Sequence, residues 1–293
     1  MKKRLIILIV FLLFLLSCGG VEETDNDSDE TEDIETSDSD TFDGSEVIKF
    51  KDVNLEKCVR TRIQKPEGDI TVEDVKNVKL LDCPRMNIKV LDGIEKLPNV
   101  SELSFYENDI VDFSILKNIE TLKVLRIEHN KNINPNTLSE LIDLEELHVQ
   151  YCESATVDSV KNLHRLKVLN ISSNNINSLN GLENLTDLTR LYTLSNKIVS
   201  LEPLKDLKNL IELRVGSNNI NSLNGLENLT GLKSIYINEN YLKNDDLPVL
   251  LNLVNLEHLN VEENCLTDFT ITNELREKGV EVVVGQQDTT RCK

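Results

Sequence analysis

The sequence has no apolar run long enough for a membrane-spanning helix, and it has few basic residues. Its longest apolar run, residues 5–16, has twelve residues, whereas a spanning helix needs about 20. Lysine and arginine together number 32 against 51 aspartates and glutamates, so the net charge is −19. A nucleic-acid partner is therefore not expected, because affinity for nucleic acids comes largely from a basic surface.

The short apolar run has the features of an export signal. It follows Lys2, Lys3 and Arg4, which predicts a signal peptide over residues 1–17. The segment Leu-Leu-Ser-Cys-Gly at residues 15–19 resembles the lipobox of bacterial lipoproteins, although Leu16 departs from its usual residue. That resemblance implies that Cys18 becomes the mature N-terminus and carries acyl chains such as palmitate, which anchor the chain to a bacterial membrane. By the same family's sorting rule, Gly19 favours the outer membrane in an organism that has one. The alternative is an ordinary signal peptide with a nearby cysteine.

Residues 18–46 are predicted to form a disordered acidic tether. Residues 19–46 contain thirteen Asp or Glu and no Lys or Arg, with almost no apolar side chains. Such a segment cannot bury enough surface to offset chain entropy, and its charges repel one another. The alternative, a cation-binding tail, lacks the spaced ligands and glycine of a calcium loop. With the tether and the basic leader set aside, residues 47–293 carry −9.

An internal repeat dominates the rest of the chain. The pattern Leu-x-x-Leu-x-Leu-x-x-Asn recurs mostly every 22 residues, and residues 174–188 differ from 218–232 at one position only. Its last position is predicted at Cys83, Asn108, Asn130, Cys152, Asn174, Asn196, Asn218, Asn240 and Asn264. The pattern predicts nine turns of one solenoid over residues 75–264.

Each part of the repeat has a physical role. The central Leu-x-Leu alternates with period two, so a short strand turns its leucines into the core and the residue between them outward. The asparagine amide can satisfy backbone groups of the adjoining turns, which predicts a stacked ladder. The segments that follow are too short for long helices and predict 3₁₀ turns on the convex side. One longer turn predicts a helix that begins near Pro248.

Capping segments are expected at both ends, because a solenoid otherwise exposes its core. Residues 47–74 form the predicted N-terminal cap, with an amphipathic helix over 53–63 and a second segment at 72–75. Residues 265–293 form the C-terminal cap, with a helix over 272–278 that Gly279 ends and a last strand over 280–284.

The cap and the repeats together resemble bacterial internalin-type proteins. The resemblance rests on Asn54-Leu55-Glu56, on Gly68-Asp69-Ile70-Thr71 with Asp74, and on the 22-residue repeats. It implies an α/β solenoid: a leucine-rich-repeat horseshoe with a parallel sheet on the concave face, a 3₁₀ and coil convex face, and a helical N-terminal cap. No Ig-like or cell-wall-sorting module is recognisable after the repeats, so the host-invasion role of internalins does not carry over.

The cysteines predict structure rather than chemistry. In an exported protein we expect Cys58 to pair with Cys83 and Cys265 with Cys292, the alternative being that all are reduced. Cys152 is left as a buried ladder residue. His148 lies four residues before it, but no orienting partner is recognisable, so a nucleophile is not expected. The histidines show no metal-ligand spacing, and no cofactor is predicted.

The outward residues of the strands suggest a binding surface. The sheet should form an arc of roughly 40 Å from nine strands about 4.8 Å apart, which suits a protein or extended peptide better than a small molecule. The residues predicted to contact a partner are Tyr106, Arg126, His148, Tyr151, Arg190, Tyr192, Leu194, Arg214, Tyr236 and His258. Tyrosine and arginine are typical of binding hot spots. Leu194 is included because Thr193 replaces a core leucine beside it, with a locally shifted strand as the alternative.

These features predict a non-catalytic protein-binding or adhesion module that is displayed on the cell envelope as a lipoprotein. The alternative is a structural or regulatory subunit of an envelope protein complex. The expected contacts are a protein ligand on the concave face and a membrane through the N-terminal lipid, with neither nucleic acid nor a small-molecule substrate.

Overall fold

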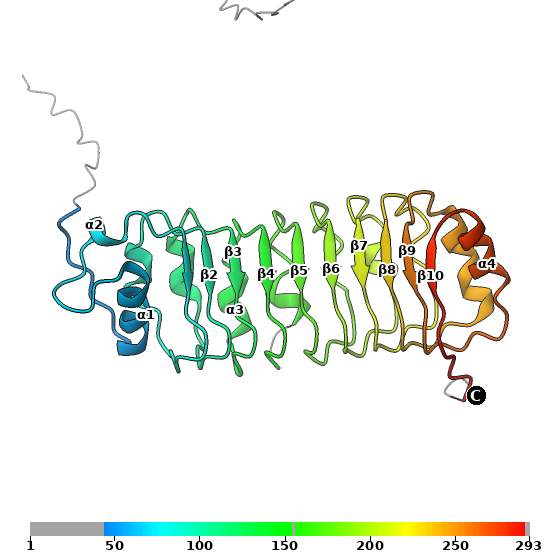
Figure 1. Cartoon of the computed structure of the whole chain (residues 1–293), viewed down its shortest axis with the longest axis horizontal. Coiled ribbons are helices and arrows are strands. Elements are labelled where there is room, and N and C mark those ends of the chain that lie inside the picture. Colours follow the sequence, from blue (N-terminus) through cyan, green and yellow to red (C-terminus); the bar gives the residue numbers. More distant parts are fainter. Residues whose placement is uncertain (1–43, 154–155, 291–293) are drawn as a thin grey trace, which may run out of the picture. The chain divides into compact units, whose positions relative to one another are not determined.

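The computed structural model describes residues 44–153 and 156–290, which all fall within one compact unit. This unit is a solenoid built around one ten-stranded parallel sheet, in which every strand pairs with its neighbours in chain order (Figure 1). The strands are β1 (Leu80–Asp82), β2 (Glu102–Ser104), β3 (Val124–Arg126), β4 (Glu146–His148), β5 (Val168–Asn170), β6 (Arg190–Tyr192), β7 (Glu212–Arg214), β8 (Ser234–Tyr236), β9 (His258–Asn260) and β10 (Glu281–Val283).

The central residue of each strand from β1 to β9 is a buried leucine or isoleucine, as the period-two pattern predicts. The predicted asparagine ladder is present behind the strand ends. Asn218 is typical: its amide nitrogen donates to the carbonyls of Thr193 and Val215 at 2.9 and 3.1 Å, and its oxygen accepts from Ile198 N–H at 3.0 Å. Each rung therefore satisfies buried backbone groups of its own turn and of the turn before it.

The first turn differs from the prediction. Leu81 pairs with Leu103 and Asp82 with Ser104, so Cys83 occupies the core position of Phe105 rather than a ladder rung. The ladder position in this turn belongs to Met86. The irregular first interval in the sequence therefore came from taking a buried cysteine for a rung, and the structural repeat from β1 to β8 is 22 residues throughout.

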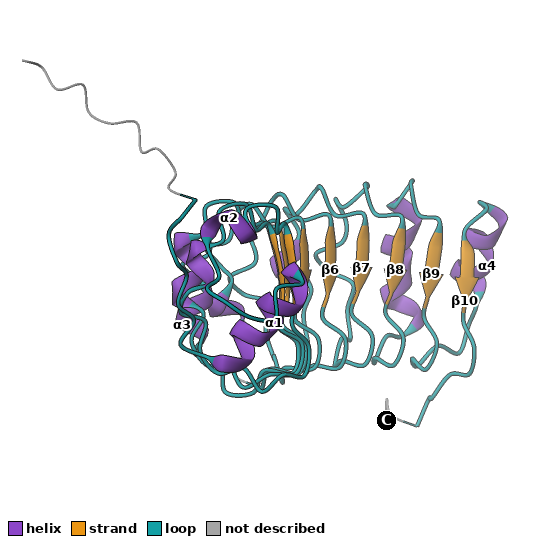
Figure 2. Cartoon of the chain, turned by 60° about the vertical axis from the view of Figure 1, so that its left-hand side comes forward, coloured by secondary structure: helices purple, strands orange, loops and turns teal. Residues whose placement is uncertain are grey.

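Short helices lie behind the sheet, on the far side of the repeats (Figure 2). They are the 3₁₀ segments η1 (Ile94–Lys96), η2 (Ser114–Asn118), η3 (Val157–Ser159), η4 (Glu202–Leu204) and η5 (Asn244–Asn252), with one four-residue α-helix, α3 (Pro135–Leu138). The predicted 3₁₀ turns are thus confirmed. The helix expected to begin at Pro248 is wrong: η5 is 3₁₀ and contains Pro248 in its interior, where the missing N–H disfavours an α-helix.

Helical caps close both ends. The N-terminal cap contains α1 (Val53–Ile63) and α2 (Val72–Val75), and the C-terminal cap contains α4 (Thr270–Glu277), which packs on β10 and η5. At one sheet edge Arg62 Nε donates to Leu80 O at 3.0 Å, and at the other Arg276 Nη2 donates to Val282 O at 2.9 Å. Each edge strand thereby has a backbone acceptor covered, which limits pairing with other chains.

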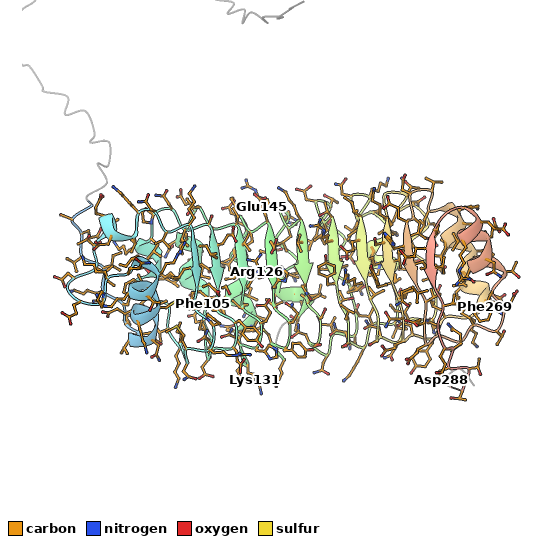
Figure 3. All side chains as sticks on the ribbon, in the orientation of Figure 1. Phe105, Arg126, Lys131, Glu145, Phe269 and Asp288 are labelled. Carbon is orange, nitrogen blue, oxygen red and sulfur yellow. A yellow bond between two sulfur atoms is a disulfide. The ribbon has the colours of Figure 1, made fainter. Side chains whose placement is uncertain are left out.

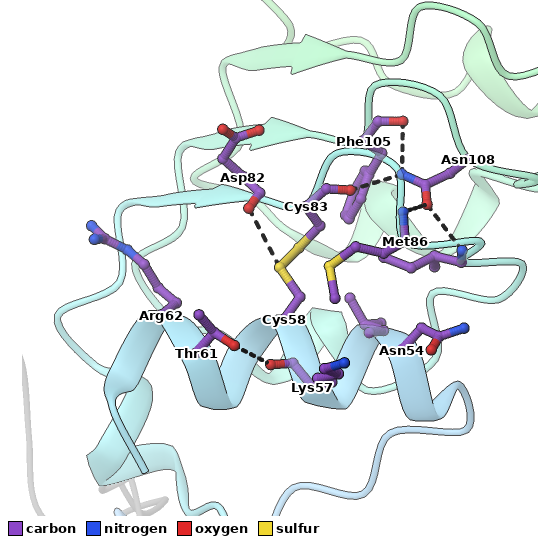
Figure 4. The surroundings of a disulfide bond; sticks show 12 residues. Asn54, Lys57, Cys58, Thr61, Arg62, Asp82, Cys83, Met86, Phe105 and Asn108 are labelled. Atoms are coloured by element: carbon purple, nitrogen blue, oxygen red, sulfur yellow. Dashed lines mark hydrogen bonds between the residues drawn. A yellow bond between two sulfur atoms is a disulfide. The ribbon is translucent and has the colours of Figure 1, made fainter. Parts of the chain in front are cut away.

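A disulfide joins the N-terminal cap to the first turn. Cys58 of α1 bonds to Cys83 with the two Cα atoms 5.8 Å apart, and both side chains are buried (Figure 4). Cys265 is also disulfide-bonded. Its predicted partner, Cys292, lies outside the described residues, as do the predicted signal peptide, Cys18 and most of the predicted tether.

Candidate functional site

The outward surface of the sheet, here called the sheet face, is built from two parallel rows of side chains. In each three-residue strand the middle residue is buried, so the first and third residues project outward together. Strand register aligns the third residues into one row: Asp82, Ser104, Arg126, His148, Asn170, Tyr192, Arg214, Tyr236, Asn260 and Val283. Lys79, expected at the start of this row, is replaced there by Asp82 because of the corrected register.

Five of these side chains form what we call the central patch: Arg190, Tyr192, Glu212, Arg214 and Tyr236, on β6 to β8. The Arg214 guanidinium lies 5.4 Å from the Tyr192 ring centroid and 4.5 Å from that of Tyr236. Both contacts are within the range of a cation–π interaction. The patch holds two cations and one carboxylate, so it presents a net positive charge within an acidic protein.

Glu212 organises the central patch. One carboxylate oxygen accepts from Arg214 Nε at 2.6 Å, and the other accepts from the Tyr192 hydroxyl at 3.0 Å and lies 3.7 Å from Arg190 Nε. Burial and then the hydrogen bond to this carboxylate raise the pKa of Tyr192. The tyrosine thus stays protonated, and the patch is fixed by its own contacts before any partner arrives.

A second group, the N-terminal ion cluster, consists of Glu102, Arg126, Glu146 and His148 on β2 to β4. Arg126 bonds to Glu146 and lies 3.6 Å from Glu102, and His148 Nε2 lies 3.0 Å from Glu146 Oε1. Figure 3 shows Arg126 over the middle of the sheet, between Glu145 at one rim and Lys131 at the other. The cluster is rich in carboxylates, so the sheet face changes in electrostatic character between β4 and β6.

A third group, the edge stack, runs along the rim where the strands end. It consists of Arg85, Tyr106, His129 and Tyr151. The Arg85 guanidinium lies 5.2 Å from the Tyr106 ring, Tyr106 meets His129 edge-on at 5.2 Å, and His129 stacks on Tyr151 at 4.5 Å with the planes 13° apart. Three of its members come from one row of residues that directly precede the ladder positions.

The residues of this row share an unusual backbone conformation. All have positive φ between 45° and 60°, although none is glycine: Arg85, Glu107, His129, Tyr151, Ser173, Ser195, Ser217, Glu239 and Glu263. Such values are uncommon for residues with a Cβ and persist where surrounding hydrogen bonds impose them. Here each is followed by a ladder position whose side chain bonds to the turn. We call these nine residues the left-handed row.

The remaining predicted contact residues lie apart from these groups. His258 Nδ1 lies 2.9 Å from Glu281 Oε2 near the C-terminal end of the sheet face. Leu194 is half-buried, and its N–H donates to Ser172 Oγ at 3.1 Å. The predicted residues thus fall into separate groups rather than one continuous band.

Two functional residues were not identified from the sequence as contact candidates. Glu212 was overlooked because its role depends on which side chains it bridges, and no local motif marks that. Arg85 was missed because the first turn was aligned on Cys83; a strict 22-residue spacing counted back from Glu107 finds it.

Nothing in the described part of the chain provides a recognisable reaction centre. Burial raises the pKa of the Cys152 thiol to about 12, so it is not a nucleophile at neutral pH. Its sulfur instead lies 3.3 Å from Ile127 O as a ladder residue. Across residues 44–153 and 156–290 no group of three or more metal-binding side chains gathers, and no helix there is long and apolar enough to cross a membrane.

Comparisons with known proteins agree on the fold. No family model and no curated protein sequence matches the chain. Among solved structures, internalin C2 of Listeria monocytogenes is 23% identical, with a TM-score of 0.59 over 82% of this chain and 94% of that one. The functional domain of InlJ from the same organism, described as including a cysteine ladder, is 20% identical, with a TM-score of 0.63 over 86% and 63%.

A leucine-rich-repeat protein of Leptospira interrogans is 25% identical, with a TM-score of 0.59 over 66% of this chain and 51% of that one. At these identities the likeness is one of architecture. The ten-stranded parallel sheet, the 3₁₀ turns behind it and the N-terminal helix α1 give this chain the leucine-rich-repeat solenoid fold of internalin-like proteins.

Proposed function

We propose that this protein is a non-catalytic binding module of the bacterial cell envelope that holds a protein partner on its sheet face. The observation that carries the proposal is the central patch, where Arg214 is held between Tyr192 and Tyr236 by Glu212. Large side chains with directional hydrogen-bonding groups, already fixed in place, lose little entropy on binding and are typical hot spots.

The form of the sheet face supports a macromolecular partner. It is an open row of side chains over ten strands, and binding of small molecules usually requires a concave pocket that covers most of the ligand. The central patch offers aromatic faces and two arginines, and the N-terminal ion cluster offers carboxylates. A partner that spans both would meet opposite charges in a fixed order, which favours specificity.

Attachment to the envelope is part of the same proposal. Lipid on Cys18 would anchor the chain, and the acidic segment after it would hold the solenoid away from the membrane. The support comes from the basic and apolar residues of the leader and from the lipobox resemblance around Cys18.

The test is a crosslinking pull-down from native cells that compares the wild type with a Tyr192→Ala, Arg214→Ala, Tyr236→Ala triple variant. A Lys205→Ala, Lys208→Ala variant serves as control, since both lysines are exposed on the loop behind the sheet of the same repeat. Capture of a specific protein by the wild type and the control, with loss in the triple variant, supports the proposal. Equal capture by all three proteins refutes a role for the central patch.

A further inference from the structure

The edge stack ends abruptly on one side. At its N-terminal end the Tyr106 ring is covered by the chain's own Arg85. At its other end His129 covers one face of Tyr151, and the next residue of the left-handed row is Ser173, which is too short to cover the second face. Tyr151 is 52% exposed. A rigid ring therefore presents a face toward the following repeat with no ring or cation of the row against it.

The chain twice shows what it places against a tyrosine face. Arg85 lies over Tyr106 and donates from Nε to Glu107 at 2.6 Å. Arg214 lies over Tyr236 and donates from Nε to Glu212, also at 2.6 Å. In both places a guanidinium is shared between an aromatic face and a carboxylate, which combines a cation–π contact with a charge-assisted hydrogen bond.

The open end of the edge stack has the same two elements without the guanidinium. Glu153 follows Tyr151 by two residues and lines a hollow with Asn174 and Asn175 of the next repeat. Its only ion pair among the described residues is a loose one with Lys131, at 3.9 Å and with both side chains more than half exposed. The Glu153 carboxylate is thus available to an incoming cation beside the free ring face.

We propose that the open face of Tyr151 is a binding site for an arginine side chain of a basic protein segment. The inference rests on the proposed function for its biological setting, but the site is separate from the central patch. Charge complementarity supports this occupant, since residues 47–293 carry −9. Arginine is favoured over lysine because its planar guanidinium stacks on a ring while it still bonds to a carboxylate.

The experiment uses the protein with residues 44–293, within which all described contacts lie, and three acetylated pentapeptides. They have the sequence Gly-Xaa-Gly-Xaa-Gly, where Xaa is arginine, lysine or neutral citrulline. The readout is the ring signal of Tyr151 in carbon-edited NMR spectra, assigned as the signal that disappears in Tyr151→Asn. Asparagine is chosen because it tolerates the positive φ of this position.

We expect the arginine peptide to shift the Tyr151 signal at about threefold lower concentration than the lysine peptide, and citrulline to have no effect. Tyr151→Phe should retain binding. Ser173→Arg should abolish it, because the chain's own guanidinium then covers the ring as Arg85 covers Tyr106. Ser195→Arg, which adds the same charge one repeat farther along the left-handed row, is the matched control and should bind as the wild type does.

An unmoved Tyr151 signal, an equal response to citrulline, or a Ser173→Arg protein that titrates like the wild type would overturn the proposal. Shifts confined to the Tyr192 and Tyr236 signals would also overturn it, while leaving the central patch as a binding surface. Conversely, a partner pull-down that ignores the central patch leaves the Tyr151 titration unaffected, so the two proposals fail separately.

Discussion

Glu212 holds Arg214 in place by accepting its Nε–H at 2.6 Å, although both residues project from the same strand, β7. The second carboxylate oxygen reaches across to the Tyr192 hydroxyl on β6. One acidic side chain that is largely buried, with 17% of its surface exposed, thus connects the cation and the aromatic ring on which binding is proposed to depend.

Replacement of Glu212 by Gln should weaken partner binding by about tenfold, because Arg214 loses a charge-assisted hydrogen bond that fixes its position. Folding should be nearly unchanged, since the amide fills the same space. Binding of the captured partner and thermal unfolding are the two measurements. Tyr192→Phe, which keeps the ring and removes only the hydroxyl, is the control; equal binding by wild type and Glu212→Gln contradicts the prediction.

The same substitution has a consequence for pH dependence. The folded protein raises the pKa of Tyr192 by burial and by its bond to Glu212. The neutral form is therefore favoured by folding, and this contribution to stability is present below pH 10 and lost as pH rises through the raised pKa. In Glu212→Gln the Tyr192 pKa should fall toward its ordinary value. Absorbance titration of the phenolate, with Tyr192→Phe to identify its share, measures the change.

Thr193→Val should stabilise the protein. Thr193 is fully buried in a core position, and its hydroxyl oxygen has no hydrogen-bond partner among the described residues. Valine has the same shape without the unsatisfied group, so the expected gain is about 1 kcal/mol, or about 2–4 °C in Tm for a domain of this size. Thermal unfolding by circular dichroism checks this, with Thr189→Val on the surface as control. A loss of stability would mean that the hydroxyl binds an internal water.

Acid should weaken the N-terminal cap through Asp74. Its carboxylate accepts from Lys65 Nζ at 2.7 Å and from Thr71 N–H at 2.7 Å, and these bonds lower its pKa to about 2. The stabilising contribution is complete above the ordinary pKa of 3.8 and is lost as pH falls from about 4 to about 2. Lys65→Ala should raise the Asp74 pKa and move this loss to higher pH. Carboxyl-carbon NMR titration follows it directly, and an unchanged Asp74 pKa would contradict the assignment.

Reduction of the Cys58–Cys83 disulfide should destabilise the cap by about 3 kcal/mol, the loop-closure contribution expected for residues 25 apart in sequence. Chemical unfolding of a Cys58→Ala, Cys83→Ala variant against the oxidised wild type measures the effect. Hydrogen exchange should show faster opening of α1 than of β5. Uniform loss of protection along the whole solenoid would show instead that the cap and the repeats unfold as one unit.

Cys18→Ala should release the protein from the membrane fraction, since Cys18 is the proposed lipid attachment site. Metabolic labelling with an alkyne-bearing palmitate analogue should mark the wild type and not the variant. Cys152→Ser is the control, because that thiol is buried in the ladder. Labelling that survives Cys18→Ala would refute lipidation at this residue.

The periodicity of the sequence was sufficient to predict the repeats, because alternate leucines followed by an asparagine every 22 residues fit few folds besides a stacked solenoid. Helix α1 was predicted with its observed bounds, since its apolar spacing is helical and a capping Asp52 precedes it. The first turn was assigned the wrong register because a buried cysteine can replace either a ladder asparagine or a core apolar residue. Only the strand pairing of Leu81 with Leu103 distinguishes the two.

The candidate surface was predictable as a row of positions but not as a set of contacts. Register alone places Tyr192, Arg214 and Tyr236 side by side, and the sequence pattern specifies that register. The bridging role of Glu212 depends on side-chain rotamers, which no spacing encodes. The edge stack depends on positive φ values at His129 and Tyr151, which non-glycine residues do not announce in a sequence.

The left-handed row bears on how such a surface can change over generations. Because the ladder amides and backbone bonds enforce its conformation, the row accepts arginine, glutamate, histidine, tyrosine or serine with the same local geometry. Fold and recognition are therefore written at different positions of each repeat. Duplication of one repeat, as in the near-identical residues 174–188 and 218–232, supplies a new scaffold unit whose row residue is free to diverge, so that affinity for a new partner can arise without loss of a stable core.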